Sequence, residues 1–496
     1  MKKTNILLIT SDQQRWDTIG AANGKIKTPN LDRLAREGIL FSRSYTVNPV
    51  CTPTRCTLLT GQYPSRHGCN TIGTNLPEDY PTIPELFNSE GYRTGLFGKA
   101  HFQSCLDPGS FEAAPRIFDD SCFAEWDGPY YGFQKARLVI GHTEENHSRG
   151  MHYGQWLKEN GVDTDRYFGH APYENYGVWD LPEEYHPSRW VADETIRALD
   201  ETDKEDDNFF YWSSFQDPHN PCVVPEPWAS MYDPGDMPDY GFREGEMEGK
   251  PPFYKSLVES ASLGLDLGEK PWYCIKDSHS LGLDEKECRK ITALYYGMIS
   301  LMDHHIGRIL DKLEEKDMLD NTLIIFTSDH GDYLGNHGLW WKGLPAYEDA
   351  QKVPFIVRHP RCETQGEESS ALQSLVDVGT TILSAAGIPV PPGLQGVDQT
   401  PSWTDASRSC RDWAQVEFRP SESDYMQKTH ITDEYKLVLY HREEYGELYH
   451  LKTDPDQREN LWDRPDYSGI KNRLLRHFIS AEMEKDGKLR TRTAPA

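Results

Sequence analysis

Short apolar runs that stop abruptly at polar residues recur along the chain. One covers residues 5–10 (Asn-Ile-Leu-Leu-Ile-Thr) and another covers residues 321–327 (Asn-Thr-Leu-Ile-Ile-Phe-Thr). Similar runs cover residues 93–97 and 208–213. Continuous apolar runs of this length are typical of strands that are buried on both faces of a parallel sheet. We therefore predict that these runs lie together in one sheet.

Helical patterns alternate with these strands. Residues 29–38 begin with a proline, carry an apolar stripe and end in a glycine, and residues 284–316 indicate one long helix. Alternating strand and helix signals favour an α/β fold. The stretches 103–189 and 231–280 show no clear periodicity, so we predict that they are loop-like insertions over the active site.

A change of pattern marks the last fifth of the chain. Residues 389–393 (Pro-Val-Pro-Pro-Gly) indicate a boundary. Short alternating runs such as residues 435–440 follow, and then a helical pattern over 470–484. We predict a catalytic domain over residues 1–392 and a C-terminal subdomain over residues 393–496, built from a small antiparallel sheet and one helix.

Two of the predicted strands end in candidate metal ligands. Asp12 and Gln13 follow the first strand, and Asp329 and His330 follow the strand at 321–327. In open α/β sheets, ligands bind at the carboxyl ends of the strands. Carboxylate and amide oxygens suit Ca²⁺ or Mg²⁺. A polar turn is the better explanation of either segment taken alone, but the two segments together predict one shared cation.

A third segment supplies a candidate nucleophile. Cys51-Thr52-Pro53-Thr54-Arg55 is followed by Leu-Leu-Thr-Gly. It resembles the Cys-x-Pro-x-Arg core of the type I, formylglycine-dependent sulfatases, although Thr54 stands where Ser or Ala is commoner. Other segments resemble the same family in the same order: Asp12-Gln13, residues 98–101 (Gly-Lys-Ala-His), 217–221 (Asp-Pro-His-Asn-Pro), Asp329-His330, 338–342 (Gly-Leu-Trp-Trp-Lys) and the tail at 447–461.

The resemblance covers nearly the whole chain and implies a fold and a chemistry. The fold is that of the alkaline-phosphatase-like superfamily: a large mixed sheet flanked by helices, with a small C-terminal α+β subdomain. A maturation enzyme oxidises the cysteine to formylglycine, an aldehyde. One hydroxyl of its hydrate attacks the sulfate ester, and the other later expels sulfate and regenerates the aldehyde.

The resemblance also implies a role for each candidate residue. The cation is bound by Asp12, Gln13, oxidised Cys51, Asp329 and His330. Arg55 and Lys99 hold the hydrate, and His101 accepts the proton of its second hydroxyl. His219 and Lys342 face the sulfate and protonate the leaving alcohol.

Two of the cation ligands depart from the commonest family pattern. Many sulfatases carry an acid where this chain has Gln13 and an Asn where it has His330. Ca²⁺ is the expected cation, but these residues lower the ligand charge and leave Mn²⁺ or Mg²⁺ open.

The expected activity is removal of sulfate from a small sulfated substrate, such as a uronic acid or hexosamine unit. The alternatives are a phosphonate monoester or phosphodiester hydrolase, a choline-type sulfatase, or a binding protein on an enzyme scaffold. Lys99 and His101 favour sulfate, because some phosphonate-hydrolysing relatives lack this pair. Trp340 and Trp341 indicate either a wall that stacks on a sugar or part of the core.

Composition limits the partners. The net charge of −27, from 79 acidic and 52 basic residues, argues against nucleic acid and against long sulfated polymers. The first apolar run is too short for a signal sequence, and no run is long enough to span a membrane. The 10 cysteines lack the spacing of a disulfide framework. We expect a cytoplasmic protein, and the oligomeric state stays open.

Overall fold

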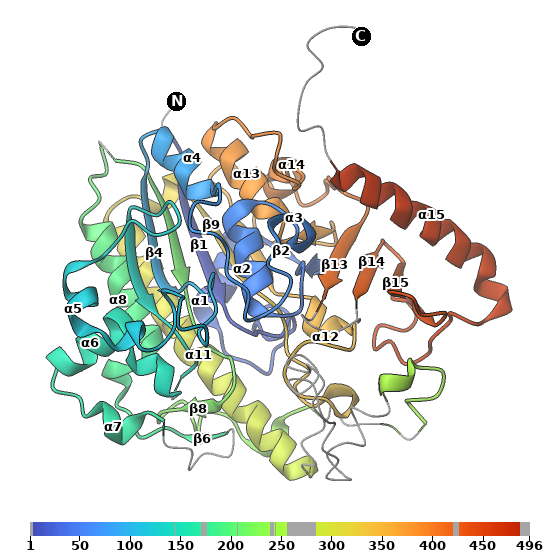
Figure 1. Cartoon of the computed structure of the whole chain (residues 1–496), viewed down its shortest axis with the longest axis horizontal. Helices are drawn as coiled ribbons and strands as arrows, with labels where there is room; N and C mark the ends of the chain where they lie inside the picture. Colours follow the sequence, from blue (N-terminus) through green and yellow to red (C-terminus); the bar gives the residue numbers. More distant parts are fainter. Residues whose placement is uncertain are drawn as a thin grey trace, which may run out of the picture.

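The computed structural model describes residues 3–143, 145–169, 176–205, 207–238, 243, 245–254, 284–419 and 426–486. Figure 1 shows a large central sheet enclosed by helices and a smaller sheet beside it, formed by the C-terminal part of the chain. This arrangement confirms the predicted α/β fold with a small α+β part at its C-terminal end.

The central sheet is mixed and has eight strands in the order β11-β2-β10-β9-β1-β7-β4-β5. Strands β9, β1, β7, β4 and β5 pair in parallel, whereas β10 is antiparallel to both of its neighbours. The bounds are β1 (Asn5–Ser11), β2 (Ile39–Phe41), β4 (Arg93–Lys99), β5 (Lys135–Val139), β7 (Phe209–Ser214), β9 (Thr322–Ser328), β10 (Phe355–Arg358) and β11 (Glu367–Ser369). Two-stranded sheets pair β3 (Ser44–Tyr45) with β12 (Gln373–Ser374), and β6 (Tyr176–Val178) with β8 (Cys222–Val224).

Helices cover both faces of this sheet. Leu7 and Ile9 point into one hydrophobic cluster with α1, α8 and α11, and their neighbours Ile6 and Leu8 point into the opposite one with α2, α4 and α13. Successive strand side chains face opposite sides, so a strand covered on both faces must be apolar throughout. The helices are α1 (Pro29–Glu37), α2 (Cys51–Thr60), α3 (Pro64–His67), α4 (Ile83–Ser89), α5 (Asp120–Glu125), α6 (Met151–Glu159), α7 (Thr164–Tyr167), α8 (Pro187–Asp200), α11 (Glu285–Glu315), α12 (Glu348–Gln351), α13 (Asp377–Ala386), α14 (Thr400–Thr404) and α15 (Ser468–Lys485).

The prediction of loop-like insertions over residues 103–189 was partly wrong. This stretch contains strand β5, which forms one edge of the central sheet, and helix α6, which packs against it. Strand β5 is only five residues long and includes Lys135 and Arg137, so it lacks the continuous apolar run of the inner strands. Parts of the same stretch do line the active-site cavity described below. Most of the predicted insertion at 231–280 lies outside the described residues.

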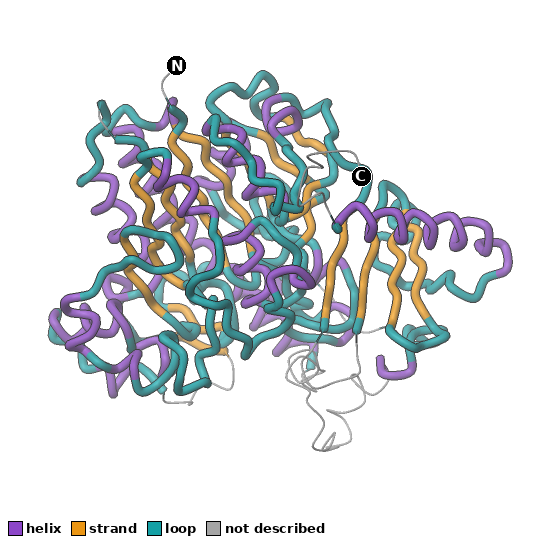
Figure 2. Tube along the Cα trace, turned by 45° about the horizontal axis from the view of Figure 1, so that its top comes forward, coloured by secondary structure: helices purple, strands orange, loops and turns teal. Residues whose placement is uncertain are grey.

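The C-terminal part forms a separate antiparallel sheet. Its strands lie in the order β13 (Ala414–Phe418), β14 (Gln427–Ile431), β15 (Tyr435–Tyr440) and β16 (Gly446–His450). Figure 2 shows helix α15 lying along this sheet, and its Leu474 packs with Leu437 and Leu448. The predicted sheet and helix are therefore both present, while the domain boundary at residues 392–393 stays a prediction.

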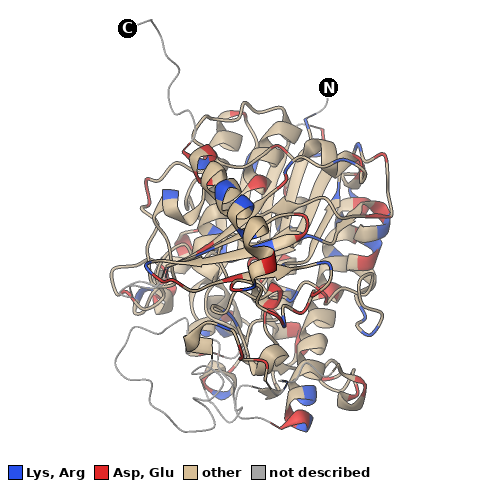
Figure 3. Ribbon diagram, turned by 90° about the vertical axis from the view of Figure 1, so that its right-hand side faces the viewer, with Lys and Arg blue, Asp and Glu red and all other residues tan. Residues whose placement is uncertain are grey.

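The surface carries charges of both signs, as Figure 3 shows for helix α15 and its surroundings. Among the described helices, none combines the length and the apolar character that crossing a membrane requires.

Candidate active site

Three parallel strands deliver their polar ends to one place. Ser11 pairs with Ser328 in the register of β1 and β9, so Asp12 and Asp329 leave the same edge of the sheet. Their backbones are tied together, because the N–H of Asp329 donates to the carbonyl of Ser11 at 3.4 Å. The N–H of Asp12 donates to the carbonyl of Asp217, just beyond β7, at 3.1 Å. The loop that carries His219 is thereby held against the two carboxylates.

Cys51 is the first residue of α2 and is fully buried. Its Sγ lies 3.2 Å from His330 Nε2, 3.2 Å from Lys342 Nζ and 3.6 Å from Asp12 Oδ1. The amino end of a helix carries a partial positive charge that favours anions. The structure therefore brings the candidate nucleophile to the sheet edge, at a position suited to an anionic substrate.

Arg55, one turn further along α2, joins the two carboxylates. Its Nε donates to Asp329 Oδ2 at 2.8 Å, and its Nη2 donates to Asp12 Oδ2 at 3.1 Å. All three side chains are inaccessible to solvent. Because a buried charge is tolerated only when it is paired, this ion-pair network fixes both acids relative to the cysteine.

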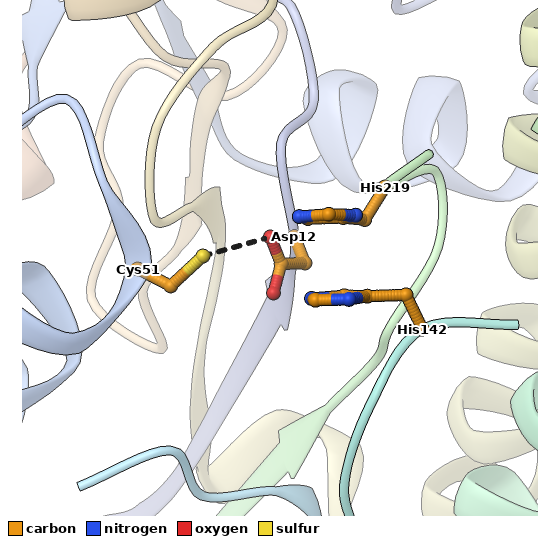
Figure 4. A group of neighbouring side chains, drawn as sticks. All are labelled: Asp12, Cys51, His142 and His219. Carbon is orange, nitrogen blue, oxygen red and sulfur yellow. Dashed lines mark hydrogen bonds between the residues drawn. The ribbon is translucent and has the colours of Figure 1, made fainter. Parts of the chain in front are cut away.

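Two lysines and two histidines form a second group in the site, the lysine–histidine group: Lys99, Lys342, His142 and His219. Lys99, the last residue of β4, lies 2.6 Å from Asp12 Oδ2 through its Nζ. Lys342 Nζ lies 2.5 Å from His219 Nε2. The ring of His219 stacks on that of His142 at a centroid distance of 3.3 Å. Figure 4 shows the two rings parallel, with Asp12 between them and Cys51.

These charges set the protonation of the site. Burial raises the pKa of the Asp12 carboxyl group, but Lys99 and Arg55 outweigh this effect and hold the pKa well below its usual value. Burial, together with His142 and Lys342, lowers the pKa of His219 well below its usual value. Burial also lowers the pKa of His330, although Asp329 opposes the shift. Asp12 is therefore ionised and both imidazoles are neutral near pH 7.

The residues at the sheet edge fit a divalent cation. Ligand atoms of Asp12, Cys51, Asp329 and His330 all lie within 4.8 Å of one another. Gln13 Nε2 donates to Asp332 Oδ2 at 2.6 Å, whereas its buried Oε1 has no hydrogen-bond partner among the described residues. An unpaired buried carbonyl oxygen is costly, and a bound cation would satisfy it. Two carboxylates, one amide oxygen and one imidazole suit Ca²⁺ or Mn²⁺.

His101 lies beside this group without a direct partner. Its imidazole is buried and lines the cavity, and neither ring nitrogen hydrogen-bonds to a described residue. Its φ of 57° is left-handed, as is the φ of 63° at Gln13. Such φ values are uncommon for residues other than glycine and concentrate at functional sites. The backbone geometry thus marks both residues as held in place by their surroundings.

Sequence reasoning missed His142 and Glu145. His142 Nδ1 lies 3.1 Å from Glu145 Oε2, and its Nε2 lies 2.5 Å from Lys99 Nζ. One available signal was the end of β5, where residues 138–142 (Leu-Val-Ile-Gly-His) run from apolar residues through glycine to a polar group. Residues 96–99 (Leu-Phe-Gly-Lys) have the same pattern at the end of β4.

A cavity of about 560 Å³ opens above these groups. His101, His142, His219 and Lys342 line its polar part. Apolar wall comes from Ile72, Leu106 and Trp341, whereas Trp340 is buried in the core. Of the two tryptophans whose role the sequence left open, only Trp341 is thus placed to contact a ligand.

Glu112 supports the His101 loop. Its carboxylate accepts hydrogen bonds from the backbone N–H groups of His101, Phe102 and Gln103 and from the Tyr130 hydroxyl. We expect Glu112→Ala to lower the free energy of unfolding by about 2–4 kcal/mol, because several buried donors lose their acceptor. Urea unfolding measures this. Glu112→Gln keeps one oxygen and should be milder, and a change below about 0.5 kcal/mol in both variants would contradict this role.

The comparisons identify the family. A family model described as Sulfatase matches residues 4–388. The chain belongs to the sulfatase family. A second model, described as N-sulphoglucosamine sulphohydrolase, C-terminal, matches residues 335–484 of this sulfatase. The protein is thus a hydrolase, and the resemblance of its motifs is confirmed at the level of the family.

Similar proteins include enzymes with different substrates. An arylsulfatase of Clostridium perfringens is 28% identical over 501 residues, covering 97% of this chain and 95% of that protein. An N-acetylglucosamine-6-O-sulfatase of Bacteroides thetaiotaomicron is 25% identical and covers 96% of this chain and 85% of that protein. The crystal structure of a phosphonate monoester hydrolase of Agrobacterium radiobacter superposes with a TM-score of 0.77 at 25% identity, covering 97% of this chain and 96% of that one.

Proposed function

We propose that this sulfatase removes sulfate from a small sulfated sugar, a uronic acid or hexosamine unit, with oxidised Cys51 as the nucleophile and one divalent cation, Ca²⁺. The observation that carries the proposal is the position of Cys51. Its Sγ lies 3.2 Å from both His330 Nε2 and Lys342 Nζ, at the amino end of α2. Cys51 thus stands between the candidate ligands of the metal ion and the ammonium group of Lys342, which can face the sulfate.

The buried acids hold the cation and the nucleophile in register. Asp12, Gln13, Asp329 and His330 would bind the ion, and oxidised Cys51 would add an oxygen ligand. When bound, such an ion draws charge away from the sulfur and supplies Lewis-acid catalysis. Arg55 keeps both carboxylates in place, and Asp329 would take the proton of the attacking hydroxyl.

Proton transfer is assigned to residues on the other side of Cys51 from the candidate metal ligands. Lys342 faces the sulfate, binds its oxygens and protonates the leaving alcohol, while the neutral His219 accepts a hydrogen bond from Lys342 Nζ and holds it there. Lys99 shares Asp12 with Arg55 and, with Arg55, orients the hydroxyls of oxidised residue 51. His101 accepts the proton of the second hydroxyl when sulfate leaves. Its neutral state suits this role, because burial and then Lys99 lower its pKa well below the usual value.

The cavity supports a small substrate. About 560 Å³ is within the range of small-molecule sites, and the acidic excess of the chain disfavours a long polyanion. Trp341 offers an aromatic face of the kind that stacks on sugar rings. The similarity to an N-acetylglucosamine-6-O-sulfatase points the same way. A formylglycine-generating enzyme would be the required partner for maturation.

Phosphonate ester hydrolysis is the second candidate, because the structure also resembles a phosphonate monoester hydrolase. A pocket with Arg55, Lys99, Lys342 and a divalent ion would attract phosphoryl groups too. Discrimination must therefore come from the fit to the transition state rather than from charge. A choline-type sulfatase would need groups that bind a quaternary ammonium ion, and Glu145 and Trp341 line this cavity beside His101, His142, His219 and Lys342.

One substrate comparison tests this proposal. We expect kcat/KM for an aryl sulfate to exceed that for the matched aryl phosphonate ester, and a sulfated uronic acid or hexosamine to exceed both. All three are assayed on one matured, Ca²⁺-loaded preparation. A faster phosphonate ester would move the protein to the second candidate, and a fast aryl sulfate without sugar activity would leave a sulfatase but remove the sugar.

A further inference from the structure

The two lysines of the site have matching surroundings. Lys99 Nζ lies 2.5 Å from His142 Nε2, and Lys342 Nζ lies 2.5 Å from His219 Nε2. The two imidazole rings stack face to face, with an interplanar angle of 8°. Each lysine thus has its own histidine, and Figure 4 shows the two histidine rings parallel to each other.

The second ring nitrogen fixes the tautomer in both pairs. His219 Nδ1 lies 2.5 Å from the backbone carbonyl oxygen of Asn220, and a carbonyl can only accept. His142 Nδ1 lies 3.1 Å from Glu145 Oε2, which also accepts the backbone N–H of His142 at 3.1 Å. In both rings Nδ1 therefore carries the hydrogen, and Nε2 accepts from a lysine.

This geometry argues against His142 as a cation ligand. Nitrogen atoms of His142 and His219 do lie within 4.8 Å of Asp12 and Cys51 ligand atoms. However, each imidazole has one lone pair, and each is already directed at a lysine ammonium group. In the group formed by Asp12, Cys51, Asp329 and His330, the His330 Nε2 instead faces Cys51 Sγ at 3.2 Å, and its Nδ1 lies 2.9 Å from the Gly331 carbonyl oxygen.

We propose that His142 and Glu145 are positioning residues that aim Lys99 at the sulfate and at residue 51, an inference that rests on the proposed function. An ammonium group has three N–H donors. Asp12 and His142 take two of them and so fix the direction of the third. Glu145 keeps the Nε2 of His142 available as the acceptor. Lys342, held by His219, is fixed in the same way from the other side.

Two substitutions of His142 separate this role from a merely structural one. Gln places its terminal amide near the position of Nε2. His142→Gln therefore keeps an acceptor for Lys99 and loses the side-chain contact with Glu145. Asn places its amide near the position of Nδ1, so His142→Asn keeps the contact with Glu145 and loses Lys99. If His142 only held its loop, His142→Asn would have the smaller effect on sulfate binding. If His142 positions Lys99, His142→Gln has the smaller effect.

The experiment measures sulfate binding without turnover. Inorganic sulfate is titrated by calorimetry into matured, Ca²⁺-loaded wild type and variants, and the mass of the peptide with residue 51 reports its oxidation in each. We expect His142→Asn to weaken sulfate binding and to lower kcat/KM about 10- to 100-fold, as for the loss of one charge-assisted hydrogen bond, with His142→Gln within about threefold of wild type. Glu145→Ala should fall between them.

The outcomes distinguish this inference from the proposed function. Equal sulfate affinity in wild type and His142→Asn, or a weaker His142→Gln than His142→Asn, would overturn the positioning role. Thermal unfolding of each variant shows whether a loss of affinity reflects a loss of folding. If the His142 variants unfold, Glu145→Ala and Glu145→Gln repeat the test, because Gln keeps an acceptor for Nδ1 and Ala does not. A wild-type enzyme that binds sulfate but hydrolyses no sulfate ester would instead contradict the proposed function alone.

Discussion

Asp329→Ala is expected to release the cation and to lower kcat/KM at least about 10³-fold, because the ion supplies several kcal/mol of transition-state stabilisation. Asp329 Oδ2 accepts from Arg55, and its Oδ1 accepts the backbone N–H groups of Gln13 and His330. The alanine variant also leaves the Arg55 guanidinium with one carboxylate fewer. We expect it to lose about 3 kcal/mol of unfolding free energy as well.

Two further variants separate metal loss from instability. Asp329→Asn keeps the shape and one oxygen acceptor, so it should retain more stability while still losing metal and turnover. Asp320→Ala removes an almost fully exposed acid at the other end of β9 and should change neither the metal content nor the turnover. Elemental analysis and kcat/KM are measured on the same samples. Full activity in rigorously metal-free wild-type protein would contradict the role of this group.

Cys51→Ala is expected to abolish turnover, by at least about 10⁴-fold, while the protein stays folded. The side chain is small and its Sγ contacts polar groups, His330, Lys342 and Asp12, rather than the hydrophobic core. Its removal therefore costs little packing. Steady-state kinetics on a sulfate ester measure the loss, and circular dichroism with thermal unfolding checks the fold.

Cys56→Ala is the matched control. Cys56 is buried in the same helix but packs in the hydrophobic cluster on one face of the sheet. It should lose some stability and keep most of the activity. If Cys51→Ala retained substantial turnover, or if Cys56→Ala were equally inactive, the nucleophile would not be residue 51.

The inner sheet and the residues at its strand ends were accessible to sequence reasoning. Residues 5–10 and 321–327 are apolar throughout because helices cover both faces of β1 and β9. That pattern located the strands, and the sharp change to Asp12 and Asp329 located the edge. The register between Ser11 and Ser328 then brings both acids together. Long helices such as α11 were equally predictable from their periodicity.

Residues near the edge strand β5 of the sheet could not be assigned to the site from the sequence. Strand β5 is short and mixed in composition, and its apolar signal is limited to Leu138-Val139 and the following Ile140. His142 and Glu145 follow this strand and enter the site only because β5 pairs with β4, next to Lys99. A contact between residues 43 positions apart depends on strand order, which no local pattern encodes. The distinction between Trp340 and Trp341 depends in the same way on the loop that carries them.

The most direct test of the central proposal is the mass of a peptide that contains residue 51. The protein is produced together with a formylglycine-generating enzyme, and turnover of a sulfate ester is measured on the same preparations. We expect the peptide to be lighter by the mass difference between the –CH2SH side chain of cysteine and the –CHO side chain of formylglycine. We also expect kcat to rise in proportion to the converted fraction. An unmodified thiol throughout, while a control sulfatase from the same cells is converted and this protein still turns over, would contradict the proposal.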